Sequence, residues 1–164
     1  MATNQQLSFL QDRIRDIGSA IFFNESDSVL KLPTSIVSTV RVDDFGFVWF
    51  FITKPKQNLR EFENDFPARL DFFKKGKTYF LQVIGKGMVV TDPEEVDRFV
   101  NLPEEEKQNL LNEMVLVKVK MTKAEYYETR TARTSWWQNA VSAFTTWFRN
   151  SNNHYRPDIY YPAS

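Results

Sequence analysis

Short runs of alternating apolar and polar residues recur along the chain, and this pattern predicts a mainly β protein. The runs span residues 19–23, 36–42, 47–53, 70–73, 78–90 and 115–121. In the last run Val117 and Val119 share one face while Lys118 and Lys120 share the other, as in a half-buried strand. The run 47–53 is almost entirely apolar, which indicates that both of its faces are covered.

Two glycine-containing segments shape this set of strands. The sequence Asp-Asp-Phe-Gly at 43–46 predicts a hairpin turn, because glycine adopts positive φ without strain. Gly85 and Gly87 interrupt the long run 78–90. Glycine within a strand typically marks a bulge or a barrel corner, so we expect one of these there.

Helical periodicity is visible at both ends of the chain and between the strands. Apolar residues at 7, 10, 14 and 17 share one helical face, and Gly18 predicts the end of that helix. Residues 59–66 carry a short helical pattern with Asn58 at the N-cap position, and further helices start near Asp92 and Pro103. An aromatic stripe predicts a C-terminal helix, which would pack on the barrel or a partner, cover a planar ligand, or lie on a membrane surface.

The residues favour a single domain over 1–164. Its core covers about 17–128, followed by the C-terminal helix 134–149 and an irregular tail over 150–164. No stretch has the composition of a linker. Short, bulged and mostly antiparallel strands favour a small β-barrel with flanking helices over an open sheet.

Composition and charge narrow the functional classes. The 164 residues carry 21 basic and 21 acidic side chains, which argues against sequence-independent nucleic-acid binding through excess positive charge. No apolar run approaches the ~20 residues of a transmembrane helix. The N-terminus lacks the basic start and apolar run of a secretory leader. We therefore expect a cytoplasmic protein that binds neither nucleic acid nor membrane.

The chain also lacks side chains that several kinds of site require. It has no cysteine, which excludes disulfides, thiolate metal sites and thiol catalysis. The single histidine, His154, excludes a site built on two imidazoles. Paired acidic residues lie at turns and helix starts, where carboxylates favour the helix dipole. We therefore expect no metal site and assign no catalytic side chain.

One segment, a strand followed by a basic turn and a helix start, is a candidate site. Lys54, Lys56, Gln57 and Asn58 supply ammonium and amide donors directly after the run 47–53. Backbone amides, a helix dipole and one or two lysines would converge there, which suits a phosphate group. An exposed loop with solvated lysines is the alternative interpretation.

Several segments resemble one known family in their order and spacing. Residues 42–51, Val-Asp-Asp-Phe-Gly-Phe-Val-Trp-Phe-Phe, resemble an acidic hairpin followed by a Trp-Phe-Phe-Thr strand. Val37-Ser38-Thr39 resembles a Met-Ser/Ala-Thr strand, 82–87 resemble Gln-Val-x-x-x-Gly, and 123–127 resemble an Ala-Glu-Tyr-Trp ending. This series is similar to the general stress protein branch of the pyridoxamine 5'-phosphate oxidase-like flavoproteins, the FMN-binding split barrels.

The resemblance implies an antiparallel split barrel that forms a homodimer and binds FMN non-covalently at the subunit interface. Val37 and Ser38 would lie along the flavin ring, and Gln82 would approach from the partner subunit. The phosphate would lie on the candidate turn. The implied cofactor-binding residues of the strand and turn are Phe51, Ile52, Thr53, Lys54, Lys56, Gln57 and Asn58. An FMN-dependent oxidoreductase acting on a small molecule is one function that follows.

The chain departs from the family pattern at the site itself. Ile52 stands where the family has threonine, unless Thr53 takes that place by a one-residue slip. Asn58 stands where the family has its phosphate-binding lysine. Lys54 and Lys56 keep positive charge in the turn, since a lysine is a mobile point charge that can act from a neighbouring position.

A further departure concerns substrate and cofactor. Ser35-Ile36 replaces the family's Arg-Pro. The set of basic residues that holds pyridoxal phosphate in the true oxidases has no full counterpart here: Arg41 resembles one of them, and Arg130 and Arg133 are candidates by position alone. Pyridoxamine 5'-phosphate oxidase activity is therefore not expected. Two alternatives to an FMN protein stay open: a binding or structural module that has lost flavin, and a barrel that holds another planar ligand such as haem or a deazaflavin.

Overall fold

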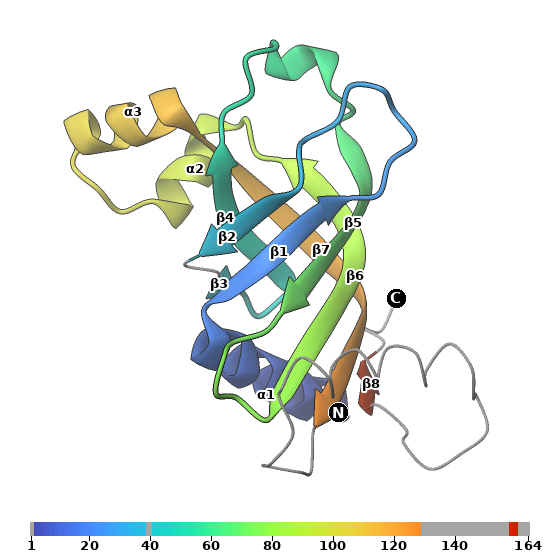
Figure 1. The fold of residues 1–164 in the computed structure, drawn as a ribbon. Helices are drawn as coiled ribbons and strands as arrows, with labels where there is room; N and C mark the ends of the chain where they lie inside the picture. The colour runs from blue at the N-terminus through green and yellow to red at the C-terminus, as the bar shows by residue number, and fades with distance from the viewer. Residues whose placement is uncertain (1, 39–40, 129–157, 161–164) are drawn as a thin grey trace.

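The computed structural model describes residues 2–38, 41–128 and 158–160 (Figure 1). Strands dominate this part of the chain, as the alternation of apolar residues predicts. In chain order the elements are α1 (Ala2–Ile17), β1 (Ser19–Asn24), β2 (Ser35–Ser38), β3 (Arg41–Val42), β4 (Phe47–Thr53), a 3-10 helix η1 (Leu59–Glu61), β5 (Asp65–Phe72), β6 (Tyr79–Val89), α2 (Pro93–Phe99), α3 (Glu104–Glu113), β7 (Met114–Glu128) and β8 (Asp158–Tyr160).

The strands form one antiparallel sheet that curls into a split barrel, which confirms the predicted fold class. Its order is β2-β1-β5-β6-β7-β4-β3, and β8 pairs with β7 beyond the end of β4. The curl brings the edge strand β2 beside β4, although the two are distant in the sheet order (Figure 1). The long strands β6 and β7 run through the middle of the sheet and join its two halves.

Local signals in the sequence account for the first strands and their turn. The predicted strand 36–42 forms as two pieces, β2 and β3. The hairpin between β3 and β4 closes at Gly46, whose φ is +82°. Asp43 organises this turn, because one of its carboxylate oxygens accepts bonds from the backbone N–H groups of Phe45 and Phe47 at 2.9 Å each.

A β-bulge lies where β6 passes Gly85. Ile84 pairs with Lys123 and Gly85 pairs with Met121, so Thr122 has no partner residue in β6. The Thr122 hydroxyl instead donates to the carbonyl oxygen of Ile84 at 3.1 Å. This confirms the expected irregularity, and it reverses which β7 side chains face inward on either side of Thr122.

Two predicted segments differ from the structure. Residues 59–66 form a single 3-10 turn and then the start of β5, rather than an α-helix. The spacing of Leu59, Phe62 and Phe66 fits a helix, but Phe66 also begins a strand alternation that continues to Phe72 and buries Phe66 in the barrel. Within the tail predicted to be irregular, Asp158–Tyr160 forms a strand on β7.

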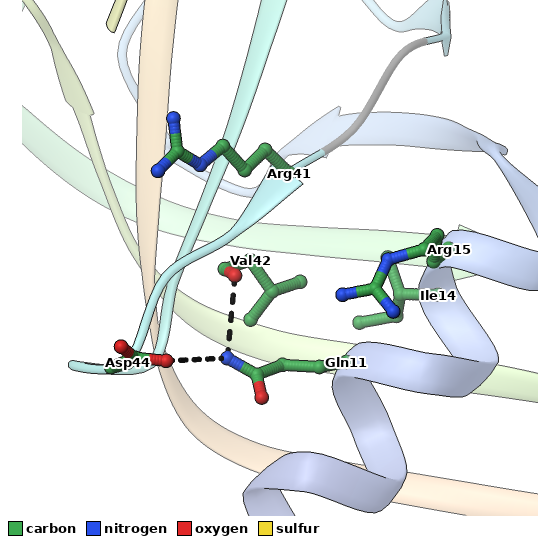
Figure 2. A pocket seen from close by; sticks show the side chains of 6 residues that line it. All are labelled: Gln11, Ile14, Arg15, Arg41, Val42 and Asp44. Atoms are coloured by element: carbon green, nitrogen blue, oxygen red, sulfur yellow. Dashed lines mark hydrogen bonds between the residues drawn. The ribbon is translucent and has the colours of Figure 1, made fainter. Parts of the chain in front are cut away.

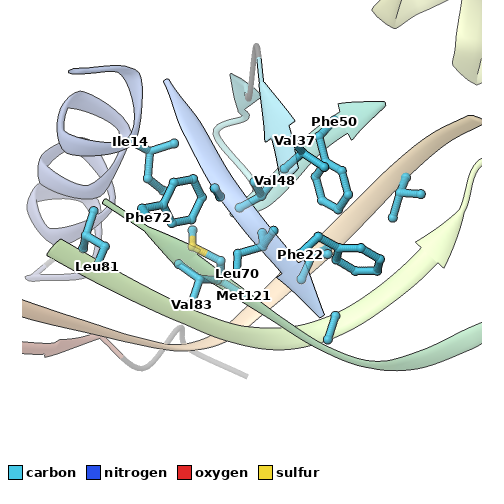
Figure 3. Close-up of a cluster of buried hydrophobic side chains, with 14 of the residues drawn as sticks. Ile14, Phe22, Val37, Val48, Phe50, Leu70, Phe72, Leu81, Val83 and Met121 are labelled. Carbon is cyan, nitrogen blue, oxygen red and sulfur yellow. The ribbon is translucent and has the colours of Figure 1, made fainter. Parts of the chain in front are cut away.

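The inner face of the barrel holds the main hydrophobic core (Figure 3). Phe22, Phe50 and Phe72 from three different strands are fully buried there. Helix α1 closes one end of the barrel by inserting the apolar face predicted from its periodicity, and it ends at Gly18 with φ of +76°. The residues of α1 buried in this core are Leu10, Ile14 and Ile17.

Helices α2 and α3 form a second layer on the outer face of β4 and β7 (Figure 1). Asp92 caps α2 by accepting a hydrogen bond from the N–H of Glu94 at 3.0 Å. Phe99 of α2 stacks on Trp49 with ring centroids 5.2 Å apart and also contacts Phe51. This layer covers the outer face of β4, as the continuous apolar run 47–53 predicts.

The predicted C-terminal helix 134–149 lies outside the described residues. Within the part of the chain that the structure describes, no helix is both long and apolar enough to cross a membrane.

Candidate functional site

The basic turn after β4 is the centre of the predicted site. Thr53, Lys54, Lys56 and Gln57 are all exposed. The turn is anchored by its backbone, since Lys54 N donates to the carbonyl oxygen of Glu113 at 2.8 Å. The side chains therefore project from a fixed loop next to the end of a buried strand.

The two lysines of the turn keep their positive charge available. Within residues 2–38 and 41–128, neither Lys54 nor Lys56 forms an ion pair with a carboxylate. The ammonium of Lys54 has a 3.5 Å contact with the carbonyl oxygen of Leu111, at the outer limit for a hydrogen bond. Two unneutralised ammonium groups at one loop suit an anionic ligand.

Asn58 has a structural role in the same turn. Its Oδ1 atom accepts a hydrogen bond from Arg60 N at 3.1 Å and caps the 3-10 helix. The cap was predicted, but the helix has only three residues. The helix dipole expected to assist phosphate binding is therefore largely absent, and the lysines are the main source of positive charge.

The strand residues of the predicted site differ in whether their side chains or only their backbone atoms can reach a ligand. Val37 and Ile52 point into the core and are almost completely buried, so only their backbone atoms can reach a ligand. Phe51 lies on the outer face, where it packs on Phe99. Ser38 is exposed on β2, the edge strand that lies beside β4.

Gln82 lies in a polar row that crosses the outer face of the sheet. The pairing register places Asp71, Gln82 and Glu125 side by side on β5, β6 and β7, and the apolar Ile21 of β1 continues the row beyond Asp71. Gln82 is only 8% exposed, and its Nε2 atom donates to Asp71 Oδ1 at 3.0 Å. Burial raises the pKa of Asp71, and the bond from Gln82 and the charge of Arg69 oppose that rise.

One chain does not bring Gln82 to the basic turn. Thr53 pairs with Met114 at one end of β7, whereas Gln82 lies opposite Glu125, eleven residues further along the same strand. This separation is about 35 Å of strand at ~3.3 Å per residue. Gln82 and the turn can therefore hold the same ligand only if they come from two copies of the chain.

The last part of β7 adds a buried acidic group that sequence analysis missed. Glu125 is completely buried and forms an ion pair with Lys123. Tyr127 donates to Glu125 Oε2 at 2.6 Å, and burial together with this bond raises the pKa of the tyrosine hydroxyl. The signal was hidden because the bulge at Thr122 turns Glu125 away from the face that simple alternation assigns it.

A separate cavity of about 470 Å³ lies between α1 and the β3–β4 hairpin (Figure 2). Gln11 bridges the two elements by donating to the carbonyl oxygens of Val42 and Asp43 at 3.4 and 3.2 Å. Arg41, the predicted counterpart of a substrate-binding residue, contributes to this cavity together with Arg15 of α1. The lining residues are Gln11, Ile14, Arg15, Arg41, Val42 and Asp44.

Sequence comparison now assigns the family. The family model for pyridoxamine 5'-phosphate oxidase like proteins matches residues 5–150, most of the chain. The chain belongs to the pyridoxamine 5'-phosphate oxidase like family. This confirms the resemblance seen in residues 42–51 and in the segments around them. No curated protein matches the chain closely enough to add a more specific relationship.

Solved structures show how widely the fold of this family is shared. A general stress FMN/FAD binding protein from Xanthomonas citri superposes with a TM-score of 0.57 at 19% identity, covering 79% of this chain and 92% of the other. A general stress protein 26 candidate from Jannaschia sp. CCS1 gives 0.56 at 16% identity, covering 96% and 99%. A protein related to general stress protein 26 from Clostridium acetobutylicum gives 0.54 at 10% identity, covering 76% and 89%. At these identities the likeness shows the fold alone.

Proposed function

We propose that this protein is a general stress-type flavoprotein that binds FMN non-covalently as a homodimer and uses it in an oxidoreductase reaction on a small molecule. The observation that carries the proposal is the fixed turn 53–58 at the end of a buried strand in a split barrel of this family, whose two lysines pair with no carboxylate of the described residues. A similar fold in Xanthomonas citri belongs to a protein named for FMN/FAD binding, which supports the choice of ligand.

The residues present fit the parts of FMN in different ways. Lys54 and Lys56 would bind the phosphate through charge-assisted hydrogen bonds. The backbone of β4 near Ile52 and the exposed Ser38 of β2 would lie along the rest of the molecule. Gln82 would come from the partner subunit, because the turn and Gln82 are too far apart within one chain.

The sheet offers a surface on which a second copy could pack. Of the helices that the structure describes, none lies on the outer face of β1, β2 and β5 (Figure 1). Ile36 of β2 is 83% exposed on that side, and it lies in the same row as Ile21 and Gln82. An exposed isoleucine that continues a row of buried polar groups supports an interface there.

The protein's contribution to the reaction would be binding rather than proton transfer by a dedicated residue. When bound, FMN supplies hydride or electron transfer itself. The chain would anchor the phosphate, hold the ring between two subunits and exclude water from it. The cavity beside Arg15 and Arg41 is a candidate entrance for an anionic small molecule. We propose a cytoplasmic location.

A second candidate function, a split-barrel binding module without flavin, is favoured by one observation. Asn58 replaces a basic residue of the family pattern, and its side chain is already used to cap η1. The turn therefore has fewer free donors than the resemblance implies.

An absorbance titration with FMN, combined with gel filtration, tests the proposal. We expect the purified protein to form a yellow complex, with one FMN bound per chain and the elution volume of a dimer. A colourless dimer that ignores added FMN would favour the binding module. A yellow monomer would contradict the placement of Gln82 in the site.

A further inference from the structure

The amide of Gln82 is held in one orientation by its neighbour on β5. Its Nε2 atom donates to Asp71 Oδ1 at 3.0 Å, and the two residues face each other across the β5–β6 pairing. Within residues 2–38 and 41–128, no donor reaches Gln82 Oε1. The amide nitrogen therefore faces along the sheet, while the carbonyl oxygen and the second N–H remain unused.

A carboxylate at position 71 is what makes this orientation unique. An ionised carboxylate only accepts hydrogen bonds, so it rejects the flipped amide, which would place Oε1 against it. Arg69 supports the ionised form, since its Nε atom lies 3.4 Å from the same Oδ1 atom and its Nη1 atom lies 3.0 Å from Glu25 Oε1. The guanidinium also lies over the ring of Phe23, with Cζ 4.1 Å from its centroid, which fixes its place.

We propose that Asp71 is a positioning residue for the flavin site: it orients Gln82 so that Oε1 points across the subunit interface and accepts the ring N–H of the partner's FMN. This inference rests on the proposed function. The oxidised flavin ring carries a single N–H, at N3, flanked by two carbonyl groups. An amide that offers an acceptor and one donor is complementary to that edge, whereas a flipped amide would oppose donor to donor.

A flavin that lacks the N3 proton can show whether Asp71 orients the Gln82 amide or only supports the structure around it. Wild-type protein and the Asp71→Leu variant are each titrated with FMN and with 3-methyl-FMN, and binding is followed by flavin absorbance and fluorescence. For wild type, methylation should weaken binding roughly three- to tenfold, the value of one hydrogen bond. For Asp71→Leu, FMN itself should bind about three- to tenfold more weakly, and methylation should then cost less than about twofold, because the two changes remove the same interaction.

Two further variants control for charge and for folding. Asp71→Asn should retain most of the affinity, because Arg69 holds the Asn Oδ1 atom toward Gln82. Asp65→Leu removes an acidic residue from the same strand, with its own ion pair to Lys86 at 2.8 Å, and should leave both titrations unchanged. If Asp71→Leu fails to fold by circular dichroism, Asp71→Ala takes its place.

The outcomes distinguish this inference from the proposed function. Wild-type protein that binds no FMN would overturn both. Wild-type protein that binds FMN and 3-methyl-FMN equally would overturn the inference alone. If methylation of FMN weakened binding equally in wild type and Asp71→Leu, Asp71 would have only a structural role, and the inference would also fail. If Asp71→Asn and Asp71→Leu lost FMN affinity equally, the charge of Asp71 would be the cause, which would overturn the inference as well.

Discussion

The outer surface of the sheet has two halves that are built differently. On β4 and β7 the chain covers itself, because α2 and α3 pack apolar and aromatic side chains onto the strands. On β5 and β6 several outward positions instead carry directional polar groups, among them Asp71 and Gln82. In the first half, ion pairs tie the helices to the sheet and to each other, as between Lys118 and Glu95. In the second half an ion pair between Lys86 and Asp65 links the neighbouring strands β6 and β5.

The covered half is suited to supporting the fold, and the half without helices is suited to recognising a ligand. An apolar layer is tolerant of small changes in position, since dispersion and hydrophobic burial are non-directional. Buried polar groups need partners at defined positions. Among the residues that the structure describes, the carbonyl oxygen of Gln82 accepts no hydrogen bond, so this part of the sheet is suited to an incoming donor. The proposed site spans both halves, because the basic turn ends the covered strand β4 of one copy and Gln82 lies on the open half of the other.

The largest effect is expected from Gly85 in β6, the strand of the second half that pairs with β7 of the first. A Cβ atom at this position would lie 2.0 Å from the carbonyl oxygen of Lys120, so Gly85→Ala should cost at least about 3 kcal/mol of unfolding free energy or prevent folding. Urea denaturation followed by circular dichroism measures this. Gly76→Ala, in a turn with open space around it, should cost only about 1 kcal/mol, from its positive φ. Equal losses would contradict the close approach at Gly85.

The next effect concerns ligand binding at the end of β4. The double substitution Lys54→Ala and Lys56→Ala should weaken FMN binding by about 1 to 3 kcal/mol, as expected for charged hydrogen bonds, without changing the melting temperature. Lys74→Ala with Lys75→Ala is a matched control, because it removes the same charge from another exposed turn. An unchanged FMN titration for the first pair would exclude the turn as the phosphate site.

A smaller effect on stability should follow from opening the covered half. Phe99→Ala removes the stack on Trp49 and the contact with Phe51, and should lower the unfolding free energy by roughly 2 kcal/mol. Thermal or urea unfolding checks this value. Leu102→Ala, at a more exposed position after α2, should change stability by less than about 0.5 kcal/mol. A Phe99 variant as stable as wild type would mean that the layer does little to support β4.

Gln82→Ala tests the half of the sheet formed by β1, β5 and β6, and its expected effect is smaller still. We expect flavin binding to weaken by about 1 kcal/mol, the value of a single neutral hydrogen bond, while the protein stays folded. Ile84→Ala, the next outward position on β6, should leave the affinity nearly unchanged. Full affinity in the Gln82 variant would remove this residue from the site.

The smallest effect is expected from the ion pair between Asp16 of α1 and Lys77, just before β6. Hydrogen bonds from Lys77 and Tyr79 lower the pKa of Asp16 below its ordinary value of 3.8. A lowered folded-state pKa contributes stability above the unfolded value and loses it as the pH falls through the folded value. Asp16→Asn should therefore be less stable than wild type at neutral pH, and the difference should shrink below about pH 4. A difference that stays constant from neutral to acidic pH would contradict this linkage.

Much of the fold could be predicted because the deciding signals are local. Gly18 ends α1, the Asp43–Gly46 turn precedes β4, and Asp92 starts α2, each through chemistry within a few residues. The segment 59–66 could not be resolved in this way, since three apolar residues fit both a helix and the entry into β5. The alternation from Phe66 to Phe72 decides for the strand only once neighbours on both sides are known.

The candidate site was only partly accessible from sequence for the same reason. Lys54 and Lys56 are visible as a basic turn, because they are contiguous. The bond between Asp71 and Gln82 is not, since it depends on the register of two strands that are joined by a turn of uncertain length. The helix dipole was wrongly expected at Asn58, because a cap residue looks the same before a 3-10 turn and before a longer helix.

The bulge at Thr122 shifts the inward–outward alternation of β7 by one residue. Upstream of it the odd-numbered residues Val117, Val119 and Met121 face the core, and downstream the even-numbered Ala124 does. If β7 kept Thr122 but ran on in strict alternation without the bulge, Lys123, Glu125 and Tyr127 would point into the core and Ala124 onto the surface. The placement of Glu125 opposite Gln82 therefore depends on the bulge that takes up Thr122 as much as on the identities of these residues.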